Sequence, residues 1–173
     1  MRLAETVTFG GSGLDRAAHL RADPEAIAAR AAAPEAAFLP LWKGKPLMTG
    51  DAAGPLALAA LAADAPALAH GREPPVFLGL SGGRPWFARD ISDWAPRDQD
   101  VGSVGAFHDP SEQVYPGLPD GHRFVDMRRA MVGLSARDAE LGATARALLT
   151  WHASHRFCAR CGAESAMAEA GWQ

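Results

Sequence analysis

The chain has 173 residues, enough for one compact domain and an appendage, and 48% of them are hydrophobic. A formal net charge of −3 gives no reason to expect a nucleic-acid or membrane partner. The 2 cysteines are three positions apart, which argues against a disulfide framework, and no apolar run is long enough to span a membrane. Because the first residues also lack the apolar core of a signal peptide, we expect a cytoplasmic location.

The N-terminal part of the chain predicts two helices. Residues 14–21 are compatible with a short helix. A second helix over residues 24–33 would begin at Pro24, a residue favoured in the first helical position, with Asp23 as its N-cap.

Strands are predicted next. The apolar stretch 38–42 has the composition of a strand, although Pro40 favours an edge or irregular strand because it lacks a backbone donor. A turn at residues 43–46 would lead into a second strand over residues 47–49. The following stretch, residues 56–62, fits either a buried strand or a helix.

A second hairpin is the clearest feature of the middle of the chain. Residues 75–80 are apolar, residues 81–84 contain the two glycines that a tight reversal needs, and residues 85–88 would return. Residues 90–122 are rich in Pro, Gly and Asp and predict a long irregular excursion.

Helices are predicted after this excursion. A first one covers residues 124–133, and a second runs from Ala136 to about His155, with Ser135 as N-cap and Asp138 in a capping-box position. Spacings of three and four place one buried face on the second helix, made of Leu141, Ala145, Leu148, Leu149 and His152. The order of strands followed by helices predicts an α+β fold.

The second helix leads directly into the only two cysteines, Cys158 and Cys161, in the sequence C-A-R-C-G. Two intervening residues let both thiolates of such a knuckle reach one zinc ion, and Gly162 suits the positive φ that the turn requires. A four-cysteine ribbon needs a second pair some 15 to 20 residues further on, whereas 12 residues follow Cys161. The knuckle therefore predicts the first half of a zinc ribbon, in a chain cut from a longer enzyme.

Other interpretations of the cysteine pair remain open at this point. The two thiols could be free and without a metal. A redox pair would normally open a helix, where the helix dipole acidifies the first thiol, whereas this pair follows one. A local metal site could use His152, His155, Cys158 and Cys161 in the pattern H-x-x-H-x-x-C-x-x-C. Finally, two chains could pool their cysteines around one zinc ion.

Five stretches of the chain occur in a familiar order. They are L-D-R-A-A-H-L-R, F-L-P-L-W-K-G-K-P-L, V-F-L-G-L-S-G-G-R-P-W-F-A-R-D-I, F-V-D-M-R-R-A-M and A-R-A-L-L-T-W-H-A-S-H-R-F-C-A-R-C-G-A-E-S. Together they resemble the N-terminal part of the NADH pyrophosphatases of the Nudix superfamily. The resemblance extends over most of the chain, and its most specific element is W-H-x-x-H-x-F-C-x-x-C-G.

This resemblance implies an N-terminal Nudix-like α+β domain, followed by a four-cysteine zinc ribbon and a catalytic Nudix domain. It further implies hydrolysis of NADH or NAD to nicotinamide mononucleotide and AMP, Mg or Mn held by glutamates of the Nudix box, and a homodimer. Related members also remove NAD caps from RNA. By the resemblance, Cys158 and Cys161 match the first pair of zinc ligands.

The Nudix signature itself, G-x5-E-x7-R-E-U-x-E-E-x-G-U with U aliphatic, is missing from the 173 residues. Its clustered carboxylates are needed because a hard divalent cation takes oxygen ligands. The nearest fragment, residues 137–140, lacks the paired glutamates. No catalytic residue is therefore assigned, and we expect the chain alone to be inactive.

We accordingly expect three parts. Residues 1–134 form an N-terminal α+β domain with a mixed sheet, residues 135–156 a connecting helix, and residues 157–173 the first half of a zinc ribbon. In the parent enzyme this region would dimerise and position the absent catalytic domain. The alternative is a stand-alone, non-catalytic binding or assembly module with a metal-binding C-x-x-C knuckle.

Overall fold

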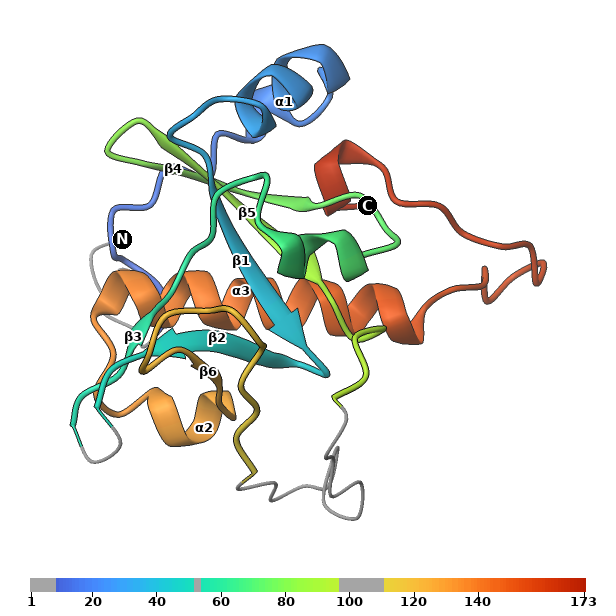
Figure 1. Ribbon diagram of the computed structural model, residues 1–173. Coiled ribbons are helices and arrows are strands. Elements are labelled where there is room, and N and C mark those ends of the chain that lie inside the picture. Colours follow the sequence, from blue (N-terminus) through green and yellow to red (C-terminus); the bar gives the residue numbers. More distant parts are fainter. Residues whose placement is uncertain (1–8, 52–53, 97–110) are drawn as a thin grey trace.

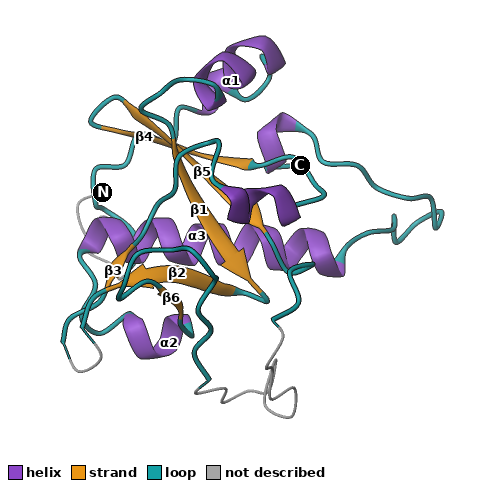
Figure 2. Cartoon of the chain, in the orientation of Figure 1, coloured by secondary structure: helices purple, strands orange, loops and turns teal. Residues whose placement is uncertain are grey.

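The computed structural model describes residues 9–51, 54–96 and 111–173, which fold around a mixed sheet (Figures 1 and 2). The sheet has the order β3-β2-β1-β5-β4, and β6 pairs with β2. Its strands are β1 Ala37–Trp42, β2 Lys45–Thr49, β3 Ala57–Leu58, β4 Val76–Ser81, β5 Arg84–Asp90 and β6 Arg123–Phe124. The helices are α1 Pro24–Ala31, α2 Met127–Ala130 and α3 Ala136–Ser154. The predicted α+β class is confirmed.

Two antiparallel hairpins, β1–β2 and β4–β5, are joined by a parallel pairing of β1 with β5. Both hairpin turns have two residues with positive φ: 48° at Lys43 and 77° at Gly44, then 59° at Gly82 and 83° at Gly83. Turns of this kind match the twist of the strands that they connect. Both predicted hairpins are confirmed, although the first return strand begins two residues earlier than expected.

Pro40 lies in a central strand, which corrects the expectation of an edge. On the side of β1 that faces away from β5, Phe38 exchanges two backbone hydrogen bonds with Leu61, at 2.9 and 2.8 Å. Pairing of β1 with β2 starts only at Leu41, opposite Pro46. Because backbone groups alternate between the two sides of a strand, the missing N–H of Pro40 falls in the gap between these contacts.

Both faces of the sheet are buried. Figure 1 shows α3 crossing behind β1, and this face of the sheet packs against the helix through Leu39, Leu41, Val76, Leu78 and Ala88 on one side and Leu141, Ala145 and Leu149 on the other. The opposite face carries an aromatic core that includes Phe38, Trp42, Phe77, Phe87, Trp94 and Phe124. The sheet is therefore the middle layer of the domain, which is typical of strands with uninterrupted apolar runs.

The helix caps agree with the sequence. The carboxylate of Asp23 accepts a hydrogen bond from the N–H of Ala26 at 2.9 Å, and the hydroxyl of Ser135 accepts one from Asp138 at 3.1 Å. Both caps satisfy backbone donors that a helix N-terminus leaves unpaired. On α3, Leu148 and His152 are only partly buried, whereas Ala139 and Glu140 are buried instead.

Three other expectations need adjustment. The helix expected over residues 14–21 is reduced to the short 3-10 helix Ala18–Leu20. The helix expected over residues 124–133 is limited to α2, because Phe124 pairs with Leu47 as part of β6. The ambiguous stretch 56–62 is extended and contains β3. The predicted excursion over residues 90–122 lies partly outside the described residues.

None of the helices described is both long and apolar enough to cross a lipid bilayer.

Candidate functional site

A knuckle that contains both cysteines follows α3 and projects away from the body of the domain (Figure 1). A β-bridge between Phe157 and Glu164 closes it. Inside the bridge, the N–H of Cys158 donates to the carbonyl of Ala163, and the N–H of Gly162 donates to the carbonyl of Cys158, both at 2.8 Å. Gly162 has a φ of 71°, as expected for the residue after the second cysteine.

The two thiols are free and exposed, and they lie next to each other. Hydrogen bonds from the backbone N–H groups of Arg160 and Cys161, and from the Cys161 side chain, lower the pKa of Cys158. Donors aimed at this sulfur stabilise the thiolate, which is the form that binds a metal. The knuckle therefore fits two corners of a tetrahedral zinc site with sulfur ligands.

The alternative of a local four-ligand site is not supported by the geometry. Nε2 of His152 donates a hydrogen bond to the carbonyl of Gly171 at 2.8 Å, so this ring points toward the C-terminal segment. Nδ1 of His155 lies 3.1 Å from the carbonyl of Trp151 and 2.9 Å from the hydroxyl of Ser154. In the parts of the chain that the structure describes, no three His, Cys, Asp or Glu side chains gather around a metal position.

Beyond the knuckle the chain returns to the body, and Trp172 anchors it there. The indole Nε1–H donates to the backbone carbonyl of Phe77 in β4 at 2.7 Å. The guanidinium of Arg21 lies 3.6 Å from the centre of the indole ring, and that of Arg16 lies 5.5 Å from it. A cation over an indole face is among the more favourable cation–π arrangements. The knuckle is thus a loop between two fixed points, the end of α3 and Trp172.

Gly171 lets this anchor approach the sheet closely. It is buried, its φ is 90°, and a Cβ atom placed on it would lie 2.6 Å from Cγ2 of Val76. Any side chain at this position would collide with β4. Position 171 therefore accepts only glycine, because the C-terminal segment and β4, which are far apart in the sequence, are in contact there.

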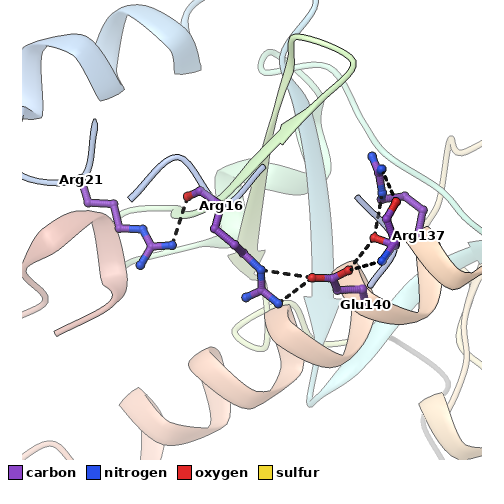
Figure 3. A network of polar contacts seen from close by, with 5 residues as sticks. Arg16, Arg21, Arg137 and Glu140 are labelled. Carbon is purple, nitrogen blue, oxygen red and sulfur yellow. Dashed lines mark hydrogen bonds and ion pairs between the residues drawn. The ribbon is translucent and has the colours of Figure 1, made fainter. Parts of the chain in front are cut away.

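Glu140, a buried carboxylate on α3, lies at the centre of a network of polar contacts, which Figure 3 shows. Oε1 of Glu140 accepts hydrogen bonds from Nε and Nη2 of Arg16 at 3.2 and 2.7 Å. Its Oε2 accepts one from the hydroxyl of Ser12 at 2.5 Å. Arg137 donates to the Ser12 hydroxyl at 3.0 Å and to the Ser12 carbonyl at 2.6 Å. Arg21 in turn donates to the Arg16 carbonyl at 3.1 Å. The network connects residues 12–21 to α3. It thereby holds Arg16 and Arg21 near the ring of Trp172.

Two opposing effects act on the pKa of Glu140. Burial raises it, but the hydrogen bonds from Ser12 and Arg16 and the positive charge of Arg16 outweigh burial, so the pKa lies below its ordinary value. Glu140 is therefore charged at neutral pH, as a buried carboxylate must be when it is paired with a guanidinium.

The sequence did not reveal this network. Glu140 is separated from Ser12 by 128 positions and from Arg16 by 124, so no local spacing relates them. The carbonyl that Trp172 contacts belongs to Phe77, 95 positions earlier in the chain, and only the fold brings the two together. The sequence shows only that Glu140 directly precedes Leu141 of the apolar helix face, and this does not identify the partners of the carboxylate.

The family described as NADH pyrophosphatase-like rudimentary NUDIX domain matches residues 35–151, more than half of the chain. The chain belongs to this family. The family predicted from the sequence is confirmed, and with it the Nudix-like character of the sheet domain.

The NADH pyrophosphatase-like domain is followed by a second match. The NADH pyrophosphatase zinc ribbon domain matches residues 153–173, from the last turn of α3 through the knuckle to the anchor. The chain is also 38% identical over 78 residues to the human protein named NAD(P)H pyrophosphatase NUDT13, mitochondrial. This alignment covers 44% of the chain and 20% of the human protein, so the chain spans about a fifth of that relative's length.

Proposed function

We propose that this chain is the N-terminal region of an enzyme that hydrolyses NADH or NAD to nicotinamide mononucleotide and AMP. In this proposal, residues 1–134 dimerise and position a catalytic Nudix domain. Residues 135–156 form the connecting helix, and residues 157–173 form the first half of the zinc ribbon. The observation that carries the proposal is the anchoring of Trp172 on β4 by its hydrogen bond to Phe77. This contact holds the segment around Trp172 against the sheet, which supports a positioning role for this region.

Zinc has a structural role in this proposal. Cys158 and Cys161 supply two thiolates, and the other two ligands come from a second cysteine pair in the same polypeptide, further along than Gln173. When bound, the ion holds the two halves of the ribbon together and contributes its binding free energy to folding. The Mg or Mn ions of catalysis belong to the Nudix box of the catalytic domain.

The proposal also extends to location and substrate range. We propose that the protein is cytoplasmic and forms a homodimer. We further propose NAD-capped RNA as an additional substrate class of the parent enzyme. The word mitochondrial in the name of the human relative concerns that protein. Cell fractionation of the tagged native gene product tests the location directly, and an organelle-bound product would contradict it.

Activity measurements test the main proposal. The 173-residue protein, incubated with NADH and Mg, is expected to release no AMP above the blank, because it lacks the carboxylate cluster of the Nudix box. The product of the intact reading frame is expected to release AMP and nicotinamide mononucleotide. An active 173-residue chain would refute the assignment of catalysis to a separate domain.

The reading frame beyond codon 173 provides an independent test. We expect a second C-x-x-C followed by a Nudix signature. A stop codon at that point would instead favour the stand-alone binding module. Zinc analysis separates the remaining metal alternatives, because about one half ion per chain, with monomerisation by a chelator, would indicate cysteines shared between two chains.

A further inference from the structure

Residues 168–172, here called the strap, lie against β4 after the chain has passed through the knuckle. Figure 1 shows the red part of the chain extending away from the body and returning to it at this strap. The strap contains the 3-10 helix Glu169–Gly171 and ends at Trp172. Its backbone conformation and its contacts oppose each other, as follows from the dihedral angles and hydrogen bonds below.

The backbone of the strap is strained. Glu169 has a φ of 49°, and Ala170 has a φ of 53° with a ψ of 35°. This left-handed region is unfavourable for residues that carry a Cβ atom, because the Cβ approaches the following carbonyl oxygen. Gly171 follows with a φ of 90°, which glycine tolerates. Two consecutive non-glycine residues in this region persist only where surrounding contacts hold them.

Contacts at three points hold the strap in this conformation. The indole N–H of Trp172 donates to the carbonyl of Phe77 in β4 at 2.7 Å. The carbonyl of Gly171 accepts a hydrogen bond from Nε2 of His152 on α3 at 2.8 Å. Ala170 packs against the aromatic core. The strained conformation is therefore imposed by tertiary contacts and not by the local sequence.

The surroundings allow the strap to open without disturbing the body. Residues 153–166, which precede it, are all exposed, and the side chain of Trp172 is only partly buried. The core of the sheet, by contrast, is fully buried. Segments with few buried apolar contacts open locally at a much lower free energy than the whole domain.

We propose that the strap is a strained latch that opens and closes on β4 while the sheet and α3 stay folded. The left-handed backbone favours the open form, and the contacts with Phe77, His152 and the aromatic core favour the closed form. Closure holds the knuckle and the chain around Trp172 against the body, and opening releases them together. If the region positions a catalytic domain, as proposed above, the latch gives that domain a held and a released arrangement. Only this consequence rests on the proposed function.

Hydrogen exchange of the native 173-residue protein, followed by NMR, tests the latch. The indole N–H of Trp172 is bonded to β4 in the closed form, so it exchanges whenever the latch opens. The amide of Phe38, bonded to the carbonyl of Leu61 at 2.9 Å, reports opening of the body. We expect the protection factor of the indole to be at least about a hundredfold smaller than that of the Phe38 amide. Equal protection would overturn the proposal, because the strap and the body would then open together.

Glycine substitutions in the strap test the strain itself. Ala170→Gly relieves the left-handed backbone of the closed form and should slow exchange of the indole about threefold. Glu169→Gly should act in the same direction. Both are used because the first also removes a methyl group from the aromatic core, and the second removes a carboxylate that interacts with the charge of Arg21. Slower exchange in either variant supports the latch.

Ala147→Gly is the matched control for these variants. It makes the same substitution at an exposed position inside α3, where glycine is unfavourable, so it should not slow the exchange. Faster or unchanged exchange in both strap variants would show that the backbone of the strap is not strained, and would overturn the proposal. Equal slowing in Ala147→Gly would do so as well.

The histidine contact gives a second, independent test. His152→Ala should speed the exchange of the indole about fivefold, because the closed form loses a hydrogen bond. His152→Gln, whose amide can donate to the same carbonyl, should restore part of the protection. His155→Gln is the control, because Nδ1 of His155 contacts the carbonyl of Trp151 in its own helix. Unchanged exchange in His152→Ala, or an equal increase in His155→Gln, would contradict the latch. Failure of the intact reading frame to release AMP would refute the proposed function alone.

Discussion

The sheet body and the C-terminal knuckle differ in what stabilises them. In the body, both faces of the sheet are packed, and side chains such as Trp42, Phe77 and Phe87 have no exposed surface. In the knuckle, residues 153–166 are all exposed, and the shape is maintained by a few backbone hydrogen bonds across a short bridge. The body is stabilised by apolar burial, whereas the knuckle has little buried surface and depends on the segments at its two ends.

This difference explains why the anchor matters. A loop with exposed residues has little free energy of its own to oppose conformational entropy, so fixing its ends reduces the number of shapes available to it. Trp172 and Gly171 provide the second fixed end through their contacts with Phe77 and Val76. The body thus restricts the conformations of the loop that carries Cys158 and Cys161.

The largest expected effect contrasts two phenylalanines, one in each region. Phe87 is fully buried between Phe38 and Phe77, so Phe87→Ala should lower the free energy of unfolding by about 3 to 5 kcal/mol. Phe157 is 63% exposed, so Phe157→Ala should change it by less than about 0.5 kcal/mol. Urea unfolding followed by circular dichroism measures both. Comparable losses in the two variants would contradict the division of the molecule into these regions.

An intermediate effect is expected at Glu140. Glu140→Gln removes the charge that pairs with Arg16 and should lower the free energy of unfolding by about 1 to 3 kcal/mol at pH 7. The matched control is Glu164→Gln in the knuckle, where the ion pair with Arg156 is exposed and 4.0 Å long, and no measurable change is expected.

The same carboxylate predicts a pH dependence. Because the pKa of Glu140 is lowered in the folded protein, its stabilisation is fully present above the unfolded-state pKa of about 4.3 and is lost as the pH falls through the folded-state pKa. Unfolding curves between pH 7 and pH 3 should therefore show a stability loss at the acid end that is smaller in Glu140→Gln. Parallel pH dependences in the two proteins would show that ionisation of Glu140 is not linked to folding, which would contradict the prediction.

The most local of the expected effects concerns the anchor. Gly171→Ala places a methyl group against Val76 and should detach the segment around Trp172, whereas Gly162→Ala, also at positive φ, meets no atom within 4 Å. Each substitution carries a backbone cost of about 1 kcal/mol, and only the first adds a collision. The indole N–H signal of Trp172 in NMR spectra reports the detachment. A shift of equal size in both variants would rule out the collision as its cause.

Several local features were predictable from the sequence because they depend on neighbouring residues. Asp23 and Ser135 cap helices through hydrogen bonds that span three positions, and the glycines at 82 and 83 specify a tight turn. The cysteine knuckle has the same character, since C-x-x-C-G encodes its own turn. The family resemblance was also contained in the order of such short segments.

Features that depend on distant segments were not predictable in this way. Pro40 occupies a central strand only because the bridge to Leu61 and the pairing with β2 leave room for a missing donor between them. Gly44 in the β1–β2 turn and Arg146 on α3 line one cavity although they are far apart in the chain, because the turn and the helix meet at one end of the domain.

The sequence by itself determined the turns, the caps, the α+β class and the cysteine pair, because each is encoded within a few residues. Tertiary structure alone decided that Glu140 is buried and charged, that His152 turns toward Gly171 instead of a metal, and that Trp172 lies on β4. The physical reason is that the free energy of these contacts depends on the partner and on the removal of water, and both are set only when the sheet and α3 come together.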